Sequence, residues 1–255
     1  MRPREVKAVL LDVEGTLCVH GVALPGAVSA VAALRESGLA IRYLTNVESR
    51  RPQAIADELT ASGFDVRPGE LHTPISAALA LFAKTSDAHV LPLVSDSLRG
   101  LFPTASAPPF THVLVGDCRE VLGYPMLDVA FRALRAGAEL VALQRGRYFK
   151  RPDGDHLDSG AIVAALEYSA QVAAQVVGKP SAEFFRTAAA DAGVPIDACL
   201  VVGDDVSTDI EGGLAAGAQV IQVRTGKYAD QVRAGQVSPA VKTVGSVVDL
   251  PWMWS

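Results

Sequence analysis

Short apolar runs rich in β-branched residues alternate with longer amphipathic segments along most of this 255-residue chain. The runs Val6 to Val13, Leu39 to Thr45 and Cys199 to Gly203 are each followed by apolar residues at helical spacing. This alternation is typical of βαβ units, in which helices cover a sheet of parallel strands. We therefore predict an α/β fold with a Rossmann-like parallel sheet at its core.

A different pattern interrupts this alternation in the middle of the chain, and the first pattern resumes at Val176. We predict one core domain formed by residues 1–75 and 177–255, with an α/β domain, residues 76–176, inserted into it. The insert is expected to contain strand His112 to Val115, helix Met126 to Arg135, strand Glu139 to Leu143, a polar loop Gln144 to Asp158 and helix Ser159 to Ala170.

The charge balance limits the kinds of partner. The chain has 23 basic and 28 acidic side chains, a net charge of −5, and no run of Lys or Arg. Affinity for the nucleic-acid backbone requires clustered positive charge, so we expect no nucleic-acid partner.

Cysteine usage and hydropathy indicate the compartment. Three cysteines without CxxC spacing predict neither a disulfide framework nor a zinc site. The first apolar run reaches Asp12 too soon for a signal peptide, and the stretch 161–177 is shorter than the roughly 20 apolar residues of a membrane span. We expect a cytoplasmic protein without a membrane partner. The C-terminal Trp252 and Trp254 fit either a packed anchor or an exposed tip.

Polar residues that directly follow apolar runs are the first place to look for a site, because ligands bind beyond the carboxyl ends of parallel strands. Four such places stand out. They are Asp12-Val13-Glu14-Gly15-Thr16, Thr45-Asn46, Gly178-Lys179-Pro180, and the segment Gly203 to Asp209 with Asp204, Asp205 and Asp209.

Several carboxylates at neighbouring strand ends repel one another, and a divalent cation relieves that repulsion. Oxygen ligands without Cys or clustered His favour Mg²⁺, which commonly shares a phosphate oxygen with its carboxylates. The matching chemistry is phosphoryl transfer, in which a carboxylate can also serve as the covalent nucleophile. These motifs therefore predict a magnesium site that acts on a phosphorylated substrate.

In order and position, the four motifs resemble those of the haloacid dehalogenase-like superfamily of Mg²⁺-dependent phosphohydrolases. The insert resembles the type-two cap of its p-nitrophenyl phosphatase-like subgroup, and segments 130–134, 147–151, 165–168 and 225–228 extend the resemblance over nearly the whole chain. The resemblance implies a Mg²⁺-dependent phosphatase that hydrolyses a small phosphorylated substrate through an aspartyl-phosphate. It also implies a cap that selects the substrate, and a homodimer.

The resemblance also implies roles for residues that handle the phosphoryl group. Asp12 corresponds to the nucleophile, which is also a metal ligand. Thr45 and the backbone amide of Asn46 correspond to groups that bind the transferred phosphoryl group. Lys179 corresponds to the residue that offsets the charge of the nucleophile and the phosphate.

The remaining roles concern the metal. By resemblance, Asp204 binds Mg²⁺ directly. Asp209 contacts the metal ligands without binding the metal itself, and Asp205 fits either role. The position two after the nucleophile supplies a backbone carbonyl to the metal, and its side chain protonates the leaving group and then activates water. The family normally has Asp there, whereas this chain has Glu14.

The Glu14 difference leaves two functions open. The backbone carbonyl does not depend on the side chain, and a carboxyl group one methylene longer still titrates, so we expect an active phosphatase. The alternative is a non-catalytic interaction protein that binds phosphate and metal but has lost turnover through Glu14. A dehalogenase is disfavoured because such enzymes of this superfamily need no Mg²⁺, which leaves the acidic cluster at 204–209 unexplained.

Three further features complete the analysis. Arg147, in the basic polar loop, is expected to be solvated, or to contact the substrate if the insert closes over the core. Asp117 repeats the Gly-Asp pattern of Asp204 without a following acid, so we interpret it as structural. Gly226-Lys227 lacks the earlier glycine of a P-loop. The identity of the substrate does not follow from the sequence.

Overall fold

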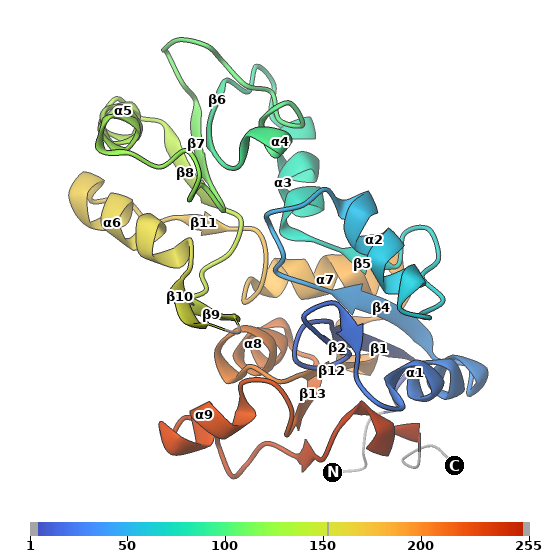
Figure 1. Cartoon of the computed structure of the whole chain (residues 1–255). Helices are drawn as coiled ribbons and strands as arrows, with labels where there is room; N and C mark the ends of the chain where they lie inside the picture. Colours follow the sequence, from blue (N-terminus) through green and yellow to red (C-terminus); the bar gives the residue numbers. More distant parts are fainter. Residues whose placement is uncertain (1–4, 152, 252–255) are drawn as a thin grey trace. The chain divides into compact units, whose positions relative to one another are not determined.

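The computed structural model describes residues 5–151 and 153–251, which form two compact units (Figure 1). The first unit comprises 1–45, 52–72 and 179–255, and the second comprises 46–51 and 73–178. Trp252 and Trp254 lie outside the described residues. None of the helices in the described ranges is long and apolar enough to cross a membrane.

The first unit is built on a six-stranded parallel sheet in the order β14-β13-β12-β1-β4-β5. Every residue of the central strand β1 is buried, as expected for a strand covered by helices on both faces. The predicted α/β fold with a parallel sheet is therefore confirmed. The strands are β1 (Ala8–Asp12), β4 (Ala40–Leu44), β5 (Leu71–His72), β12 (Cys199–Gly203), β13 (Gln219–Val223) and β14 (Thr243–Val244).

The order of these strands determines where a ligand can bind. From β1 the chain adds β4 and β5 on one side, and later β12, β13 and β14 on the other. The strand order therefore reverses beside β1, and the carboxyl ends of β1 and its neighbours border the crevice in which ligands bind in such sheets.

Helices and short turns complete the first unit. Helix α1 packs against β4, α7 against β1, and α8 against β13. A two-stranded hairpin turns at His20-Gly21, where both φ angles are positive, as tight hairpin turns require. The elements are β2 (Cys18–Val19), β3 (Val22–Ala23), α1 (Ala27–Glu36), α2 (Pro52–Ala61), α7 (Ala182–Asp191), α8 (Glu211–Ala216) and α9 (Tyr228–Arg233).

The segment after Gly203, where the spacing of apolar residues predicts a helix, is divided in the structure. A wide helical turn, Val206–Ile210, precedes α8, and the Asp205 side chain accepts a hydrogen bond from the backbone N–H of Ser207 at its start. Such a side-chain cap satisfies an N–H that has no partner within the turn. This turn carries Asp209.

The second unit contains a four-stranded parallel sheet in the order β11-β8-β7-β6. Alternate residues of β7 enter different cores: Val113 and Val115 pack with α5 and α6, and Leu114 packs with α3 and α4. The elements are α3 (Pro74–Ala83), β6 (Val90–Leu93), α4 (Asp96–Arg99), β7 (His112–Val115), α5 (Tyr124–Arg135), β8 (Glu139–Ala142), α6 (Gly160–Ala170) and β11 (Gln175–Val176).

The prediction of a polar loop from Gln144 to Asp158 is wrong for most of its length. The segment forms an antiparallel hairpin of β9 (Tyr148–Arg151) and β10 (Gly154–Leu157). The aromatic pair at 148–149 favours a strand, and Gly154 at φ +133° supplies the turn conformation. Phe149 stacks on His156, and the Arg151 guanidinium lies over its ring. Alternation of hydrophobic and polar residues is weak here, which hides the strands.

One ion pair connects α1 to the loop before β5. The Arg35 guanidinium donates to both carboxylate oxygens of Glu70 at 2.7 and 2.8 Å, and the backbone N–H of Arg67 donates to Glu70 at 3.0 Å. Burial opposes ionisation of Glu70, but these bonds outweigh it and hold its pKa below the usual value. The pair therefore stabilises the first unit while Glu70 is ionised.

We expect Glu70→Gln to lower the free energy of unfolding at pH 7 by about 1.5–3 kcal/mol, since it removes a charge-assisted bidentate bond. The pKa of Glu70 is lower in the folded protein than in the unfolded chain. The stability from its ion pair with Arg35 is therefore fully present above the unfolded pKa, and it is lost as pH falls through the folded pKa. In urea denaturation, the difference in free energy of unfolding between Glu70→Gln and the unmodified protein should become smaller below about pH 4. Glu36→Gln, an exposed position on α1 next to Arg35, is the control. An equal deficit at pH 3 and pH 7 contradicts the interpretation.

Candidate active site

Three carboxylates meet at the carboxyl ends of β1 and β12. The ligand atoms of Asp12, Asp204 and Asp209 lie within 4.8 Å of one another, and all three side chains are buried. The register brings Asp12 and Asp204 together, because Leu11 pairs with Val202, β1 ends at Asp12, and Asp204 directly follows the last residue of β12. Among the described residues, this is the one acidic or His/Cys group with the spacing of a metal site.

Lys179 supplies the positive charge of this cluster. Its ammonium donates to Asp12 Oδ1 at 2.5 Å and to Asp209 Oδ1 at 2.6 Å, and only 2% of the residue is exposed. Burial alone lowers the pKa of a lysine, but the two carboxylates outweigh this effect and raise the pKa of Lys179 above its ordinary value. Lys179 is therefore charged when it contacts them.

The charges of this cluster do not balance. Three carboxylates face one ammonium, which leaves two negative charges when all are ionised. Burial, together with Asp12 and Asp209, raises the pKa of Asp204 well above its usual value. Asp12 Oδ2 is buried without a hydrogen-bond partner among the described residues. Two uncompensated negative charges, carried by oxygen donors alone, fit a divalent cation with the donor set that Mg²⁺ prefers.

Two glycines leave room for the Asp204 carboxylate. A Cβ on Gly15 or on Gly226 would overlap Asp204 Oδ2, and both residues have positive φ, +86° and +57°. The backbone N–H of Lys227 donates to the same oxygen at 2.7 Å. Asp204 is thus held between two loops that contribute only backbone around it. In the sequence, Gly226-Lys227 is recognisable only as an incomplete P-loop match, and nothing there predicts this contact with Asp204.

Asp205 has different partners from Asp204. Its Oδ1 accepts from the Ser207 N–H at 2.9 Å, the Ser207 hydroxyl at 2.7 Å and Gln231 at 2.8 Å, and its Oδ2 accepts from the Lys227 ammonium at 2.8 Å. Burial alone would raise the pKa of Asp205, but Lys227 and the other donors hold it well below the usual range. Asp205 is therefore an ionised carboxylate whose oxygens are already occupied.

The Glu14 side chain is exposed, and its Oε1 accepts a hydrogen bond from the His20 N–H at 2.9 Å. His20 lies in the turn between β2 and β3. The carboxylate of Glu14 is thus directed to this hairpin, and Glu14 is not among the buried carboxylates of the cluster.

Two threonines lie near Asp12 in the first unit. Thr45 directly follows β4, where Leu44 pairs with Asp12, and it is 1% exposed. Thr16 is fully buried in the loop after β1, and its hydroxyl has no hydrogen-bond partner among the described residues. Thr16 belongs to the first of the four sequence motifs but was assigned no role there, although a hydroxyl four residues after Asp12 in a strand-end loop was a usable signal. Asn46 belongs to the second unit.

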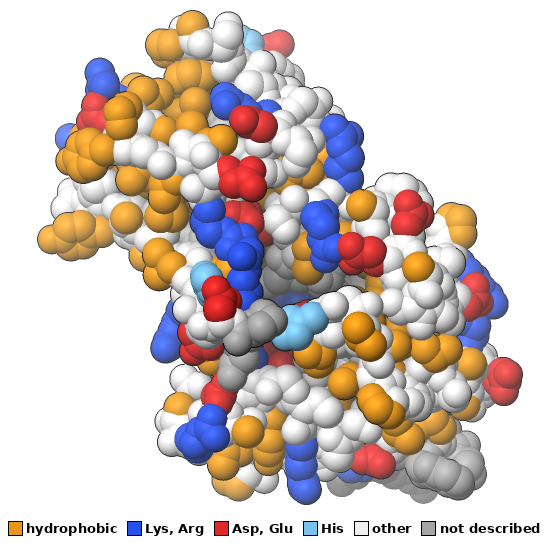
Figure 2. Space-filling model, in the orientation of Figure 1, with side chains coloured by type: hydrophobic (Ala, Val, Ile, Leu, Met, Phe, Trp, Pro, Cys, Tyr) orange, Lys and Arg blue, Asp and Glu red, His pale blue; other side chains and the backbone are white. Residues whose placement is uncertain are grey.

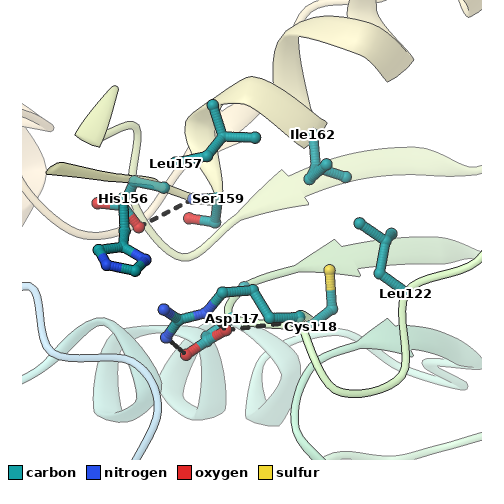
Figure 3. Close-up of a pocket in the computed structure, with 10 residues that line it drawn as sticks. Asp117, Cys118, Leu122, His156, Leu157, Ser159 and Ile162 are labelled. Atoms are coloured by element: carbon teal, nitrogen blue, oxygen red, sulfur yellow. Dashed lines mark hydrogen bonds and ion pairs between the residues drawn. The ribbon is translucent and has the colours of Figure 1, made fainter. Parts of the chain in front are cut away.

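The second unit has two adjoining cavities. The larger, about 390 Å³, is lined by Arg119, Arg151 and His156 together with three serines, Asp117 and Glu120. The smaller, about 190 Å³, has an apolar side formed by Leu122, Leu157 and Ile162 (Figure 3). The two share Asp117, Arg119 and His156. Arg147 is exposed and lines neither.

A buried polar network lies beside the smaller cavity. The Gln144 amide donates to Glu48 Oε1 at 3.3 Å and to the Ser159 hydroxyl at 2.8 Å. Burial raises the pKa of Glu48 well above its usual value. This network connects segment 46–51 to the rest of the second unit. Nothing in the sequence pattern predicted it, because its members are far apart in the chain.

Apolar side chains also gather on the surface of this unit. Figure 2 shows hydrophobic side chains over the region of α5 and α6, where Tyr124, Val129 and Tyr168 are exposed.

Comparison with known proteins places these features in a family. The family model described as haloacid dehalogenase-like hydrolase matches residues 9–105, and a HAD-hydrolase-like model matches 176–250. The phospholysine phosphohistidine inorganic pyrophosphate phosphatase of Danio rerio is 37% identical over 97% of this chain and 92% of its own length. The haloacid dehalogenase-like hydrolase domain-containing protein 2 of Bos taurus is 36% identical over 88% of this chain and 86% of its own.

Solved structures agree on the fold. The p-nitrophenyl phosphatase from Archaeoglobus fulgidus superposes with a TM-score of 0.88 at 24% identity, covering 98% of this chain and 99% of that one. NagD from E. coli K-12 gives a TM-score of 0.82 at 24% identity, covering 96% and 98%. With two matching family models and near full-length relatives, the chain belongs to the haloacid dehalogenase-like hydrolases.

Proposed function

We propose that this chain is a Mg²⁺-dependent phosphatase that hydrolyses a small phosphorylated substrate through an aspartyl-phosphate on Asp12. The observation that carries the proposal is the state of Asp12: Lys179 holds one carboxylate oxygen, and the other is buried without a hydrogen bond beside Asp204 and Asp209. Relatives named as phosphatases support the reaction class.

In the first step, Asp12 Oδ2 attacks phosphorus, and the bond from phosphorus to the leaving oxygen breaks. Lys179 stays on Oδ1, which orients the nucleophile and offsets the charge of the phosphoryl oxygens. Asp12, Asp204 and the Glu14 backbone carbonyl would hold Mg²⁺, which would supply further positive charge to the phosphoryl group. Asp209 acts through Lys179, because its Oδ1 accepts from that ammonium and its Oδ2 from the Asp205 N–H.

Other groups hold the phosphoryl oxygens. Thr45 is buried after β4, and the next backbone amide in the chain is that of Asn46. The buried Thr16 hydroxyl is a further donor. Donors positioned in a buried site stabilise the transferring group without reorganisation of water.

Glu14 protonates the leaving oxygen and then takes a proton from the water that hydrolyses the aspartyl-phosphate. Its carboxylate rests on the His20 N–H, at the hairpin after β1, and must leave this bond to reach the leaving group. Its longer side chain gives it the reach for this movement. In the alternative, a binding protein without turnover, Glu14 would keep its hydrogen bond to the His20 N–H and would not reach the leaving group.

We expect Glu14→Gln to lower kcat by about 10²–10⁴-fold, because an amide cannot transfer the proton. Glu14→Asp should keep kcat within about tenfold of the unmodified enzyme, since it restores a titratable group. Mg²⁺ affinity should not change in Glu14→Gln, because the backbone carbonyl remains. Turnover that appears only in Glu14→Asp would instead support the non-catalytic alternative.

The leaving group of the substrate is proposed to be anionic. The larger cavity of the second unit is lined by Arg119 and Arg151, whose guanidinium groups lie over the Phe149 ring at 4.5 and 5.2 Å from its centre. Such contacts hold long cationic side chains in place. The relative from Danio rerio is named for phospholysine, phosphohistidine and pyrophosphate, of which pyrophosphate has an anionic leaving group.

The proposal is tested by phosphate release from p-nitrophenyl phosphate and pyrophosphate in parallel. Removal of divalent cations with EDTA should abolish release, and added Mg²⁺ should restore it. If the site binds an anionic leaving portion, pyrophosphate should be preferred, because the nitrophenyl portion of the other substrate carries no charge before cleavage. Release that persists in EDTA would contradict the metal dependence. Tight Mg²⁺ and phosphate binding without turnover would favour the binding protein.

A further inference from the structure

Lys227 contacts both consecutive aspartates after β12. Its backbone N–H donates to Asp204 Oδ2 at 2.7 Å, and its side-chain ammonium donates to Asp205 Oδ2 at 2.8 Å. Lys227 immediately precedes α9. One residue at the start of this helix therefore holds two neighbouring carboxylates that lie more than twenty positions earlier in the chain.

Two buried glutamines extend this contact to the backbone of the acidic loop. Gln222 on β13 donates to the Asp204 carbonyl at 2.9 Å and to Gln231 Oε1 at 3.2 Å. Gln231 on α9 accepts at Oε1 from the Val206 N–H at 3.0 Å and donates to Asp205 Oδ1 at 2.8 Å. Both side chains are almost fully buried. Buried polar groups with several partners fix the conformation around them.

The same network reaches Asp209. Asp205 caps the turn Val206–Ile210 through Ser207, and its carbonyl accepts from the Asp209 N–H at 2.9 Å. The Asp205 N–H in turn donates to Asp209 Oδ2 at 3.2 Å. A displacement of Asp205 would therefore move both ends of the acidic segment.

We propose that Lys227, Gln231 and Gln222, with Asp205 as their anchor, form a positioning network that holds Asp204 and Asp209 in the arrangement that binds the cation. Asp205 accepts three hydrogen bonds at Oδ1 and one at Oδ2, and it is not part of the carboxylate group that has the spacing of a metal site. The inference rests on the proposed Mg²⁺ site. It concerns cation affinity, which is measurable without turnover.

The sign of the effect separates positioning from simple electrostatics. A lysine close to a cation site repels the cation, so removal of its charge alone tightens Mg²⁺ binding. Loss of a positioning contact weakens binding, because Asp205 is left buried without its counter-charge and the loop relaxes. Gln231→Leu also removes a positioning contact to Asp205, but it leaves the charge of the protein unchanged.

The experiment measures Mg²⁺ affinity by titration calorimetry of the full-length protein without substrate. Lys227→Met and Gln231→Leu should each weaken Mg²⁺ binding by about 10–100-fold, the range for groups that orient metal ligands. Arg233→Met is the matched control, because it removes an exposed cation from the same helix. Its Mg²⁺ affinity should match that of the unmodified protein. Urea denaturation in parallel shows that each variant is folded.

A double variant tests the role of Asp205. Asp205→Asn alone removes the carboxylate that faces the Lys227 ammonium and should weaken Mg²⁺ binding, whereas Asp205→Asn with Lys227→Met removes both charges and should recover most of the Mg²⁺ affinity. If Asp205 were a ligand, the double variant would bind as poorly as Asp205→Asn. That result would overturn the proposal, as would tighter or unchanged binding in folded Lys227→Met.

The test also separates this inference from the phosphatase proposal. Mg²⁺ binding in the unmodified protein without phosphate release would remove the proposed reaction, while the variants still decide whether the network positions the site. Phosphate release with unchanged Mg²⁺ affinity in Lys227→Met and Gln231→Leu would support the enzyme and overturn the network.

Discussion

Asp12→Asn should lower kcat for phosphate release by about 10⁴-fold or more, the scale of losing a covalent nucleophile. The amide is nearly isosteric with the carboxylate but cannot attack phosphorus. Asp12 Oδ2 is the one unpaired oxygen that the buried cluster offers next to Lys179, and no other described carboxylate there has both features. No neighbouring group can therefore take its place.

The measurement compares phosphate release at saturating substrate and Mg²⁺, together with mass spectrometry of acid-quenched enzyme. The unmodified protein should yield a phosphorylated peptide that contains Asp12, and the variant should not. Asp57→Asn, an exposed position on α2, is the control and should keep full activity. Turnover that persists in Asp12→Asn would assign the nucleophile elsewhere.

Lys179→Met should be the most destabilising of these substitutions. It leaves Asp12 and Asp209 buried without their ammonium, and removal of one partner from a buried ionic cluster costs about 3–5 kcal/mol. Burial already raises the pKa of Asp209, and loss of Lys179 raises it further. Activity should be lost as well, because the same ammonium orients the nucleophile.

The pH dependence of the Lys179→Met deficit has a definite sign. A carboxyl group whose folded pKa lies above its unfolded value binds more protons when folded, so stability falls as pH rises. The deficit in urea denaturation should therefore be smaller at pH 5 than at pH 8. Added Mg²⁺ should recover part of it by binding the folded state. Lys7→Met, exposed in the same unit, is the control. An unchanged free energy of unfolding in Lys179→Met would mean that Lys179 does not offset the charges of Asp12 and Asp209.

Much of the fold was predictable because strand and helix patterns are local. Strands β7 and β12 coincide with their apolar runs, since a strand buried on both faces appears as a continuous apolar run. The same runs placed Asp12 and Asp204 at strand ends. Parallel pairing then brings those ends to one edge of the sheet, as the register of β1 and β12 shows.

Other features depend on contacts between distant residues, which local patterns do not encode. The hairpin of β9 and β10 was expected to be a loop because its residues are mostly polar. The contact of Glu14 with His20 depends on the tight turn after β2. Thr16 was not selected because its burial follows from packing around the loop.

The sequence by itself determined the α/β class and which carboxylates stand at the ends of parallel strands. Only the tertiary structure decided how Asp204 and Asp205 divide their roles, because consecutive residues at one strand end have the same local pattern. Asp204 joins Asp12 and Asp209, whereas Asp205 is held by Lys227 and Gln231. The physical reason is that hydrogen-bond partners from distant elements set the direction of each side chain. Those partners become neighbours only when β12, β13 and α9 have packed together.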